Sequence, residues 1–175
     1  ITPQFADALI LYRRFIDDGF GIWKSLPDPI ADAALWTNFQ RAFSSFGRLS
    51  WDFSSRAPSA DFLDLTVTIT NGRVETCLYE KALNLYLYLP PHSAHAPGVL
   101  KGLIHGMLLR INNLTTNPDK RAALIRRFHQ RLRARGYNNS LLLPLFDAAL
   151  SQPIVQRQKP DSTVPAPIYL HLQFH

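Results

Sequence analysis

Two neighbouring aspartates, Asp17 and Asp18, are the residues best placed to do chemistry. They follow an apolar stretch, 9–16, that is predicted to be a strand, and they precede 20–23, which can return antiparallel. Asp18-Gly19 is typical of a hairpin turn, and at a tight turn two neighbouring side chains can reach one cleft. Two carboxylates held close together repel each other unless a cation lies between them, and Mg²⁺ favours such oxygen ligands. The pattern indicates a metal site at a hairpin tip, and a solvated pair of turn residues is the alternative.

The basic residues are concentrated in one segment of the chain. The formal net charge is +6, and residues 97–136 contain nine basic residues and one acid, Asp119. Residues 1–96 contain ten acids and eight basic residues, and residues 137–175 are balanced. Such a concentration indicates a polyanionic partner, nucleic acid in preference to a membrane, and a solvated helical face is the alternative.

The first half of the chain predicts one helix and a small antiparallel sheet. Asp28 suits a helix N-cap and Pro29 the first helical position, and apolar residues then recur at helical spacing up to Gly47, which can end the helix. Alternating residues and the turn dipeptide Asn71-Gly72 predict a hairpin. The predicted strands are 49–53, 62–70 and 73–81, with a loop at 54–60 and a further short strand at 85–89.

Beyond Pro97 the period becomes helical. A wide apolar stripe covers 99–111, and Asn117-Pro118 begins a second helix that Gly136 closes. A third helix is predicted over 142–150. Leu124, Ile125, Phe128 and Leu132 are predicted to point inward, with Lys120, Arg127, Arg131 and Arg135 on another face of the second helix.

The residues around the aspartates resemble a known family. Phe15-Ile16-Asp17-Asp18 resembles the aromatic-x-Asp-Asp signature of reverse transcriptases, and 14–23 resembles its version in Penelope-like retroelements and their cellular relatives. Phe15 stands where tyrosine is the commoner residue in that group, so the ring is kept. Further segments that resemble the group follow in order at 62–67, 76–81, 88–97, 135–137 and 168–175.

This resemblance implies an RNA-directed DNA polymerase of α+β fold, with an antiparallel palm sheet and one packing helix followed by an all-helical thumb. The implied divisions are palm 1–92 with the catalytic hairpin at 9–23, a helix-turn-helix-like thumb at 93–152, and a linker and start of a connector at 153–175. Asp17 would ligate two Mg²⁺ ions, with Mn²⁺ as the alternative, and Asp18 would support them.

The implied reaction is template-directed nucleotidyl transfer. The metals would activate the primer 3′-hydroxyl and steady the leaving pyrophosphate. The implied partners are an RNA template, a DNA primer duplex and dNTP. The expected phosphate contacts are Lys81, Lys101, Arg110, Lys120, Arg127 and Arg131.

The resemblance also predicts parts that no residue of this chain matches. The fingers, the nucleotide-binding part of the palm and the group's other metal-binding aspartate would precede Ile1, so the chain alone is expected to be inactive. The sequence has no recognisable signal peptide and no apolar run of membrane-spanning length. An intracellular location, in the nucleus or the cytoplasm, is expected.

Two other functions fit parts of the pattern. A non-catalytic, nucleic-acid-binding helix-turn-helix module from a decayed or domesticated retroelement would use residues 97–136. An acid–base hydrolase would use Asp17 and Asp18, but no nucleophile pattern accompanies them.

Several other residues have ordinary structural interpretations. Cys77, His92 and His95 would need a fourth ligand to hold zinc, so a packing role is favoured. Asp64 is expected to face outward or to cap an element. Trp23, Trp36 and Trp51 are expected in the core, and Tyr86 and Tyr88 are as suited to stack on bases as to pack.

Overall fold

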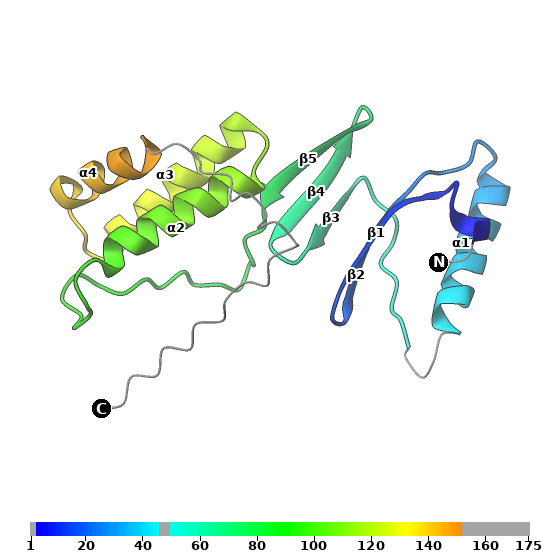
Figure 1. Ribbon diagram of the computed structural model, residues 1–175, viewed down its shortest axis with the longest axis horizontal. Coiled ribbons are helices and arrows are strands. Elements are labelled where there is room, and N and C mark those ends of the chain that lie inside the picture. Colours follow the sequence, from blue (N-terminus) through cyan, green and yellow to red (C-terminus); the bar gives the residue numbers. More distant parts are fainter. Residues whose placement is uncertain (1–2, 46–49, 152–175) are drawn as a thin grey trace, which may run out of the picture.

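The computed structural model describes residues 3–45 and 50–151. These residues form an α+β fold, as the sequence predicts, with two small antiparallel sheets and four α-helices in the described part. The elements are η1 (Pro3–Phe5), β1 (Leu9–Phe15), β2 (Asp18–Trp23), α1 (Pro29–Ser44), β3 (Ser59–Phe62), β4 (Leu65–Thr70), β5 (Arg73–Leu78), α2 (Val99–Leu114), α3 (Pro118–Ala134) and α4 (Asn139–Leu150). Figure 1 shows them in a row: α1, the β1–β2 hairpin, the sheet β3-β4-β5, then α2 to α4. None of the helices described is long and apolar enough to span a membrane.

The β1–β2 hairpin turns two residues earlier than predicted. Phe15 pairs with Asp18 and Arg14 with Gly19, so the turn is Ile16-Asp17, and the predicted turn at Asp18-Gly19 is wrong. Ile16 has a φ of 51°, which β-branched residues rarely adopt. In this register Gly21 pairs with Tyr12, and an added Cβ at Gly21 would lie 3.2 Å from the Leu9 Cδ1 atom, so the position favours glycine.

Helix α1 covers the hairpin with aromatic side chains. It begins as predicted, since the Asp28 side chain accepts a hydrogen bond from the Ile30 N–H and Pro29 occupies the first turn. It ends at Ser44, and the predicted stop at Gly47 lies outside the described residues. Trp23 of β2 meets Trp36 of α1 edge-to-face at 5.1 Å between ring centroids.

The predicted strand at 49–53 is wrong over its described part, because residues 50–53 are coil. This coil serves the same core, since Trp51 packs on Phe43 of α1 with ring centroids 4.8 Å apart. Its apolar residues therefore indicate burial against α1 and not pairing in a sheet. Trp23, Trp36 and Trp51, which were expected in the core, are partly buried among these aromatic side chains.

The second sheet has the order β3-β4-β5. The prediction of one strand over 62–70 is wrong, because a tight turn at Leu63-Asp64 divides it into β3 and β4. Strand β3 also begins at Ser59, inside the predicted loop. Alternation continues through a two-residue turn that lacks Gly and Pro, so periodicity alone cannot reveal it. The hairpin at Asn71-Gly72 is confirmed, with both residues at positive φ (51° and 72°).

Residues 82–90 connect the sheet to the helices without forming the strand predicted at 85–89. Tyr86 has a φ of 49°, which interrupts an extended ladder. Tyr88 turns to the helices, where its ring meets that of Phe128 at 5.4 Å. The leucines of this segment are exposed: Leu83, Leu85, Leu87 and Leu89.

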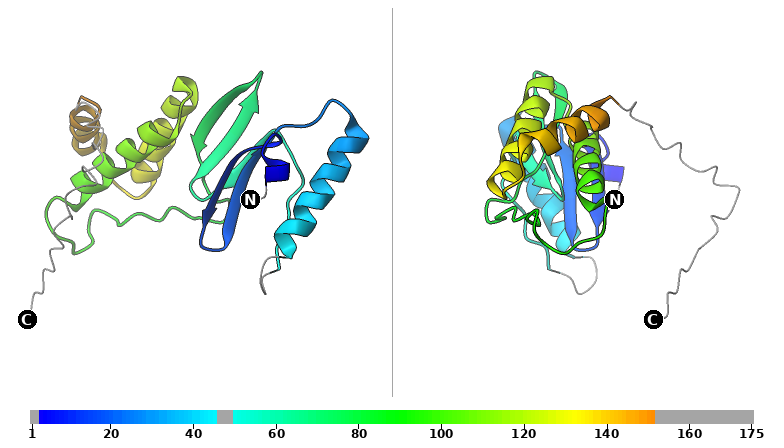
Figure 2. Two further views of the ribbon diagram at one scale, coloured as in Figure 1. Left: turned by 45° about the vertical axis from the view of Figure 1, so that its right-hand side comes forward. Right: turned by 90° about the vertical axis from the view of Figure 1, so that its left-hand side faces the viewer.

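Helices α2, α3 and α4 lie together (Figure 2), and they pack on one another and on Tyr88. We call these three helices, together with the segment from Tyr86, the helical unit. The Asn117 cap is confirmed, because its side chain accepts hydrogen bonds from the N–H groups of Asp119 and Lys120. Gly136 ends α3 at a φ of 99°. The core of the unit comprises Ile104, Leu108, Phe128, Leu132, Tyr137, Leu142 and Phe146.

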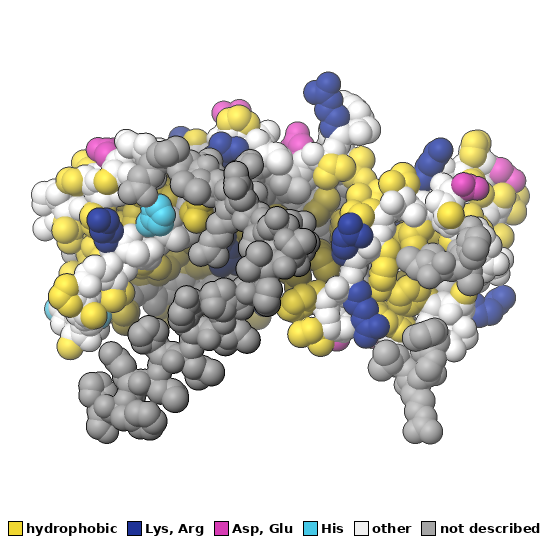
Figure 3. All heavy atoms as spheres, in the orientation of Figure 1, with side chains coloured by type: hydrophobic (Ala, Val, Ile, Leu, Met, Phe, Trp, Pro, Cys, Tyr) yellow, Lys and Arg dark blue, Asp and Glu magenta, His cyan; other side chains and the backbone are white. Residues whose placement is uncertain are grey.

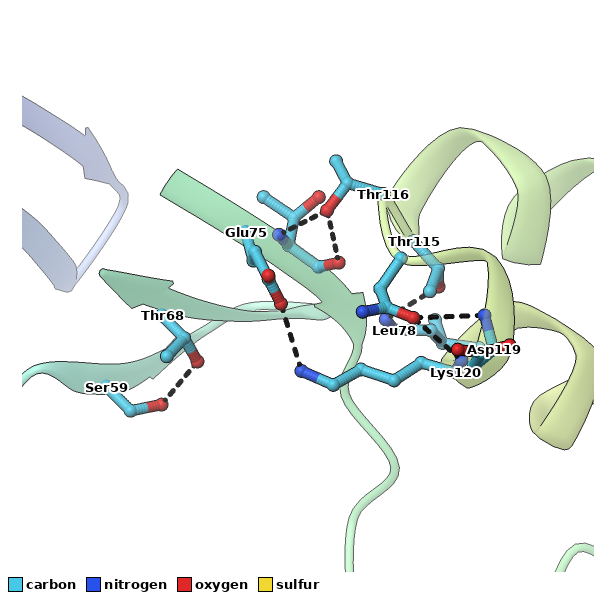
Figure 4. Close-up of polar contacts among 10 residues, drawn as sticks. Ser59, Thr68, Glu75, Leu78, Thr115, Thr116, Asp119 and Lys120 are labelled. Atoms are coloured by element: carbon cyan, nitrogen blue, oxygen red, sulfur yellow. Dashed lines mark hydrogen bonds and ion pairs between the residues drawn. The ribbon is translucent and has the colours of Figure 1, made fainter. Parts of the chain in front are cut away.

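The turn between α2 and α3 attaches the helical unit to the free edge of β5. The Thr116 N–H donates to the Thr76 carbonyl at 3.0 Å, and the Thr76 N–H donates to the Thr116 hydroxyl oxygen at 3.0 Å. The buried Thr115 hydroxyl accepts from the Leu78 N–H at 3.2 Å. Figure 4 shows these bonds crossing from the strand to the turn. The β5 edge is thereby covered, which leaves fewer unpaired backbone groups open to solvent.

Candidate metal-binding hairpin and nucleic-acid interface

The two aspartates lie at the tip of the β1–β2 hairpin, and both are exposed. Asp17 occupies the turn itself, whereas Asp18 is the first residue of β2. Asp18 lines a cavity of about 430 Å³ between the hairpin and the second sheet. Its other lining residues are Phe15, Asp61, Leu63, Asp64, Tyr79 and Lys81. Of the two aspartates, Asp18 lines this cavity and Asp17 does not.

A basic side chain that sequence reasoning did not assign holds the hairpin turn. Arg14 Nε donates to the Ile16 carbonyl at 2.8 Å, and the Arg14 guanidinium lies 5.0 Å from the Trp51 ring centre. In Figure 3, basic and hydrophobic side chains lie next to one another over this hairpin. The two neighbouring arginines Arg13 and Arg14 were the sequence feature that could have indicated this role. Nothing in the sequence indicated that Arg14 would contact Trp51.

The carboxylates of Asp17 and Asp18 could supply part of the ligand set of a magnesium ion. No three His, Cys, Asp or Glu residues come together to hold a metal ion in residues 3–45 and 50–151. Magnesium is commonly bound through one or two carboxylates together with substrate phosphates and water. Asp17 and Asp18 can supply such carboxylates, and the remaining ligands would have to come from elsewhere.

Four of the six predicted phosphate contacts are paired with acids of this chain. Arg110 Nη2 lies 2.5 Å from Asp64 Oδ2, and Lys120 Nζ lies 3.3 Å from Glu75 Oε2. Figure 4 shows the Lys120–Glu75 pair reaching from α3 to β5. The remaining two cations share Glu80. We call the four residues the acid-paired cluster: Arg110, Lys120, Arg127 and Arg131.

Glu80 is the most enclosed acid of these pairs. Arg127 Nη1 and Arg131 Nη1 donate to its two carboxylate oxygens, and its side chain is 14% exposed. Arg131 also lies over the Tyr86 ring, 3.6 Å from the ring centre. Burial, followed by the Glu80 charge, raises the pKa of the Tyr86 hydroxyl. Tyr86 and Tyr88 are thus occupied by contacts within the chain.

The other two predicted phosphate contacts, Lys81 and Lys101, form no ion pair with any acid that the structure describes. Lys81 follows the second sheet and borders the cavity at the hairpin, while Lys101 lies on α2, and both are exposed. Arg135, expected on the basic line of α3, donates from Nε to the Tyr88 carbonyl at 2.6 Å and so holds the connecting segment.

A second basic face of α3 was missed by the sequence analysis. Arg126, Gln130 and Arg133 are exposed and recur at helical spacing on the side away from Phe128. In the described part of the chain Arg126 and Arg133 form no ion pair, although Arg133 Nη1 donates to the Tyr137 carbonyl at 3.1 Å. We call these three residues the outer face of α3. The spacing of its residues was the available signal.

Residues 87–144 match the animal helix-turn-helix domain. The matched segment runs from the connecting segment through α2 and α3 into α4, and so covers most of the helical unit. The comparison with curated proteins gave no match, and neither did the comparison with solved structures. The match supports a helix-turn-helix module that binds nucleic acid.

Proposed function

We propose that the chain binds nucleic-acid duplexes through its helical unit, with the outer face of α3 against the phosphate backbone. The observation that carries this proposal is the concentration of positive charge in residues 97–136, which contain nine basic residues and one acid. It falls on helices similar to the animal helix-turn-helix domain. Contacts from Lys and Arg to phosphates give binding that is independent of sequence and sensitive to salt.

The outer face of α3 is favoured because, within residues 3–45 and 50–151, its arginines form no ion pair with an acid. Arg126 and Arg133 are seven residues apart, so they stand roughly 10 Å apart along the helix axis. Both point to solvent beside Gln130, which can also donate to a phosphate. A phosphate there displaces only water, together with one bond from Arg133 to the Tyr137 carbonyl.

The test is duplex binding by fluorescence anisotropy across a series of salt concentrations. Replacing Arg126 and Arg133 together by Ala should weaken binding. The slope of the logarithm of the binding constant against the logarithm of the salt concentration should become shallower by about 0.9 for each phosphate that the variant no longer binds. The matched control removes two cations far from the helical unit, Lys24 and Arg41. An equal loss of affinity in the control would show that total charge, and not the outer face, drives binding.

We further propose that this module serves an RNA-directed DNA polymerase, as the thumb behind a metal-binding palm hairpin. Three observations support it: the carboxylates of Asp17 and Asp18 at an exposed tip, the cavity beside Asp18, and the basic side chain of Lys81 on its wall. Metal ions held there would activate a primer hydroxyl and steady the leaving group. Asp17 and Asp18 would hold those ions, and Lys81 would meet the phosphates of the primer or the nucleotide.

The backbone of the hairpin supports the same assignment. Ile16 holds a positive φ, and strained positions of this kind cost of order 1–3 kcal/mol and cluster at functional sites. Arg14 holds the carbonyl of that residue. The register leaves Asp17 in the turn, between the two strands.

Metal binding can be tested on this chain without requiring polymerase activity. Paramagnetic Mn²⁺ should broaden the amide resonances of Phe15 to Gly19 selectively, and Asp17→Asn with Asp18→Asn should remove the broadening. In the intact parent polypeptide, Asp17→Ala should abolish primer extension while duplex affinity stays within about twofold of the unchanged protein. If Mn²⁺ broadens no hairpin signal, or if the Asp17→Ala parent still extends primers, the non-catalytic module remains as the function.

A further inference from the structure

The acid-paired cluster is a group of four cations whose charges are already neutralised by acids of the same chain. Its cations come from α2 and α3, and the acids that face them, Asp64, Glu75 and Glu80, come from the second sheet and its connections. Arginine binds carboxylates and phosphates in the same way, through parallel N–H donors. We propose that Asp64, Glu75 and Glu80 mask a second duplex-binding surface, and that a nucleic-acid backbone displaces them. This inference rests on the duplex binding proposed above.

The three masking acids are held with different strength. The side chains of the Arg110–Asp64 pair are 45% and 59% exposed, and those of the Lys120–Glu75 pair are 48% and 39% exposed. Ion pairs this exposed contribute little to stability, so a phosphate can replace the carboxylate at small cost. Glu80 is more enclosed and binds two arginines, so it is the acid whose removal changes the surface most.

The two arginines on Glu80 differ in what else holds them. The Arg127 side chain is 54% exposed, with Glu80 as its ion-pair partner. The Arg131 side chain is 22% exposed and also stacks on the Tyr86 ring. An incoming phosphate therefore takes Arg127, while Arg131 keeps Glu80 and remains a packing residue.

The surface has room for a ligand. A cavity of about 330 Å³ opens between the second sheet and α3, and Glu80, Lys120 and Arg127 are on its wall. Its remaining lining is formed by Thr66, Cys77, Leu78, Tyr79, Ala123 and Leu124. A phosphate can enter beside Lys120 and Arg127, while the Glu80 carboxylate gives up Arg127 and stays on Arg131.

Contacts other than the ion pairs also hold the helices on the sheet. Thr115 and Thr116 already make hydrogen bonds to β5, and Leu78 is buried against Ile111 and Leu124. Exchange of the pairs for phosphate contacts therefore leaves the junction closed. This separates masking from a role of the acids in joining the two parts.

The test measures binding of a short RNA–DNA hybrid to the whole 175-residue chain at low salt. Glu80→Gln should bind the hybrid more tightly, on the order of fivefold, because it uncovers Arg127. Asp147→Asn is the matched control, since it removes one exposed acid from α4, outside the cluster. Its gain should stay below about twofold, the part due to net charge alone.

A coupled substitution separates masking from long-range charge. Arg127→Ala should weaken binding more in the Glu80→Gln background than in the unchanged chain, because the arginine is available only when uncovered. Equal losses in the two backgrounds overturn the proposal, as does a Glu80→Gln gain no larger than that of Asp147→Asn.

Two further measurements distinguish a change in binding from a change in folding. Thermal unfolding of each variant shows that the fold is kept. If Glu80→Gln does not fold, Glu75→Gln with Lys120→Ala provides the same comparison at the more exposed pair. An unchanged chain that binds duplex with no gain on unmasking overturns the masking alone, and absence of binding in the chain and in every variant overturns the proposed function as well.

Discussion

The guanidinium carbon of Arg131 lies 3.6 Å from the centre of the Tyr86 ring. The same guanidinium donates to Glu80, so one side chain of α3 secures both the end of the second sheet and the segment that follows it. An arginine expected to meet phosphate is thus the residue that fastens the connecting segment to the helical unit. Its removal should affect stability before it affects binding.

Arg131→Met should lower the free energy of unfolding by about 2 kcal/mol, because it removes a cation–π contact and a partly enclosed ion pair. Denaturant unfolding followed by circular dichroism measures this change. Arg126→Met on the outer face of α3 is the control, and it should change stability by less than about 0.5 kcal/mol. Equal effects of the two substitutions would mean that the contacts of Arg131 add nothing to the fold.

Two glycines should respond to alanine in opposite directions. Gly136 has a φ of 99° at the end of α3, so Gly136→Ala should destabilise the protein by about 1 kcal/mol. Gly102 lies inside α2 with open space where a Cβ would stand, so Gly102→Ala should stabilise it by about 0.5–1 kcal/mol. Thermal unfolding of both variants checks the signs, and a stabilising Gly136→Ala would contradict the positive φ.

The buried hydroxyl of Thr115 should matter more than the exposed one of Thr116. Thr115 is 1% exposed and accepts from the Leu78 N–H, so Thr115→Val leaves that donor without a partner. The expected cost is about 1–3 kcal/mol. Thr116→Val removes a comparable bond at an exposed site, where water can replace it, and should cost less than about 1 kcal/mol. Hydrogen exchange of the Leu78 amide locates the effect, which should be absent in Thr116→Val.

Asp32 should make part of the stability depend on pH in the acid range. Hydrogen bonds from Arg56, Trp23 and the Leu26 N–H lower the pKa of the Asp32 carboxyl from 3.8 to about 2. A group with a lowered pKa stabilises the fold above its unfolded value, and that contribution is lost as the pH falls from about 4 through about 2.

Asp32→Asn should therefore lower the melting temperature at neutral pH and flatten the loss of stability between about pH 4 and pH 2. Unfolding followed at a series of pH values measures both effects. Asp28→Asn is a suitable control, because asparagine also caps helices and Asp28 is exposed at the start of α1. An acid profile of Asp32→Asn that parallels that of the unchanged chain would contradict the assigned cause.

Helix caps, one hairpin turn and one helix end could be predicted from a few neighbouring residues each. The caps at Asp28 and Asn117, the hairpin at Asn71-Gly72 and the end of α3 at Gly136 all lie where predicted. Each depends on one or two residues whose backbone preference acts over a single turn. The mixture of helices and strands also follows from the local sequence, and the concentration of positive charge follows from the composition of residues 97–136.

Pairing and packing decided the rest. The turns at Ile16-Asp17 and Leu63-Asp64 go against residue preference, because strand register and burial outweigh a local cost. The number of cations on α3 can be read from the sequence, but their pairing with Glu80 cannot. Glu80 lies 47 residues from Arg127 and 51 residues from Arg131 along the chain. Charge is a property of composition, whereas the charge available to a partner depends on which groups the fold brings into contact.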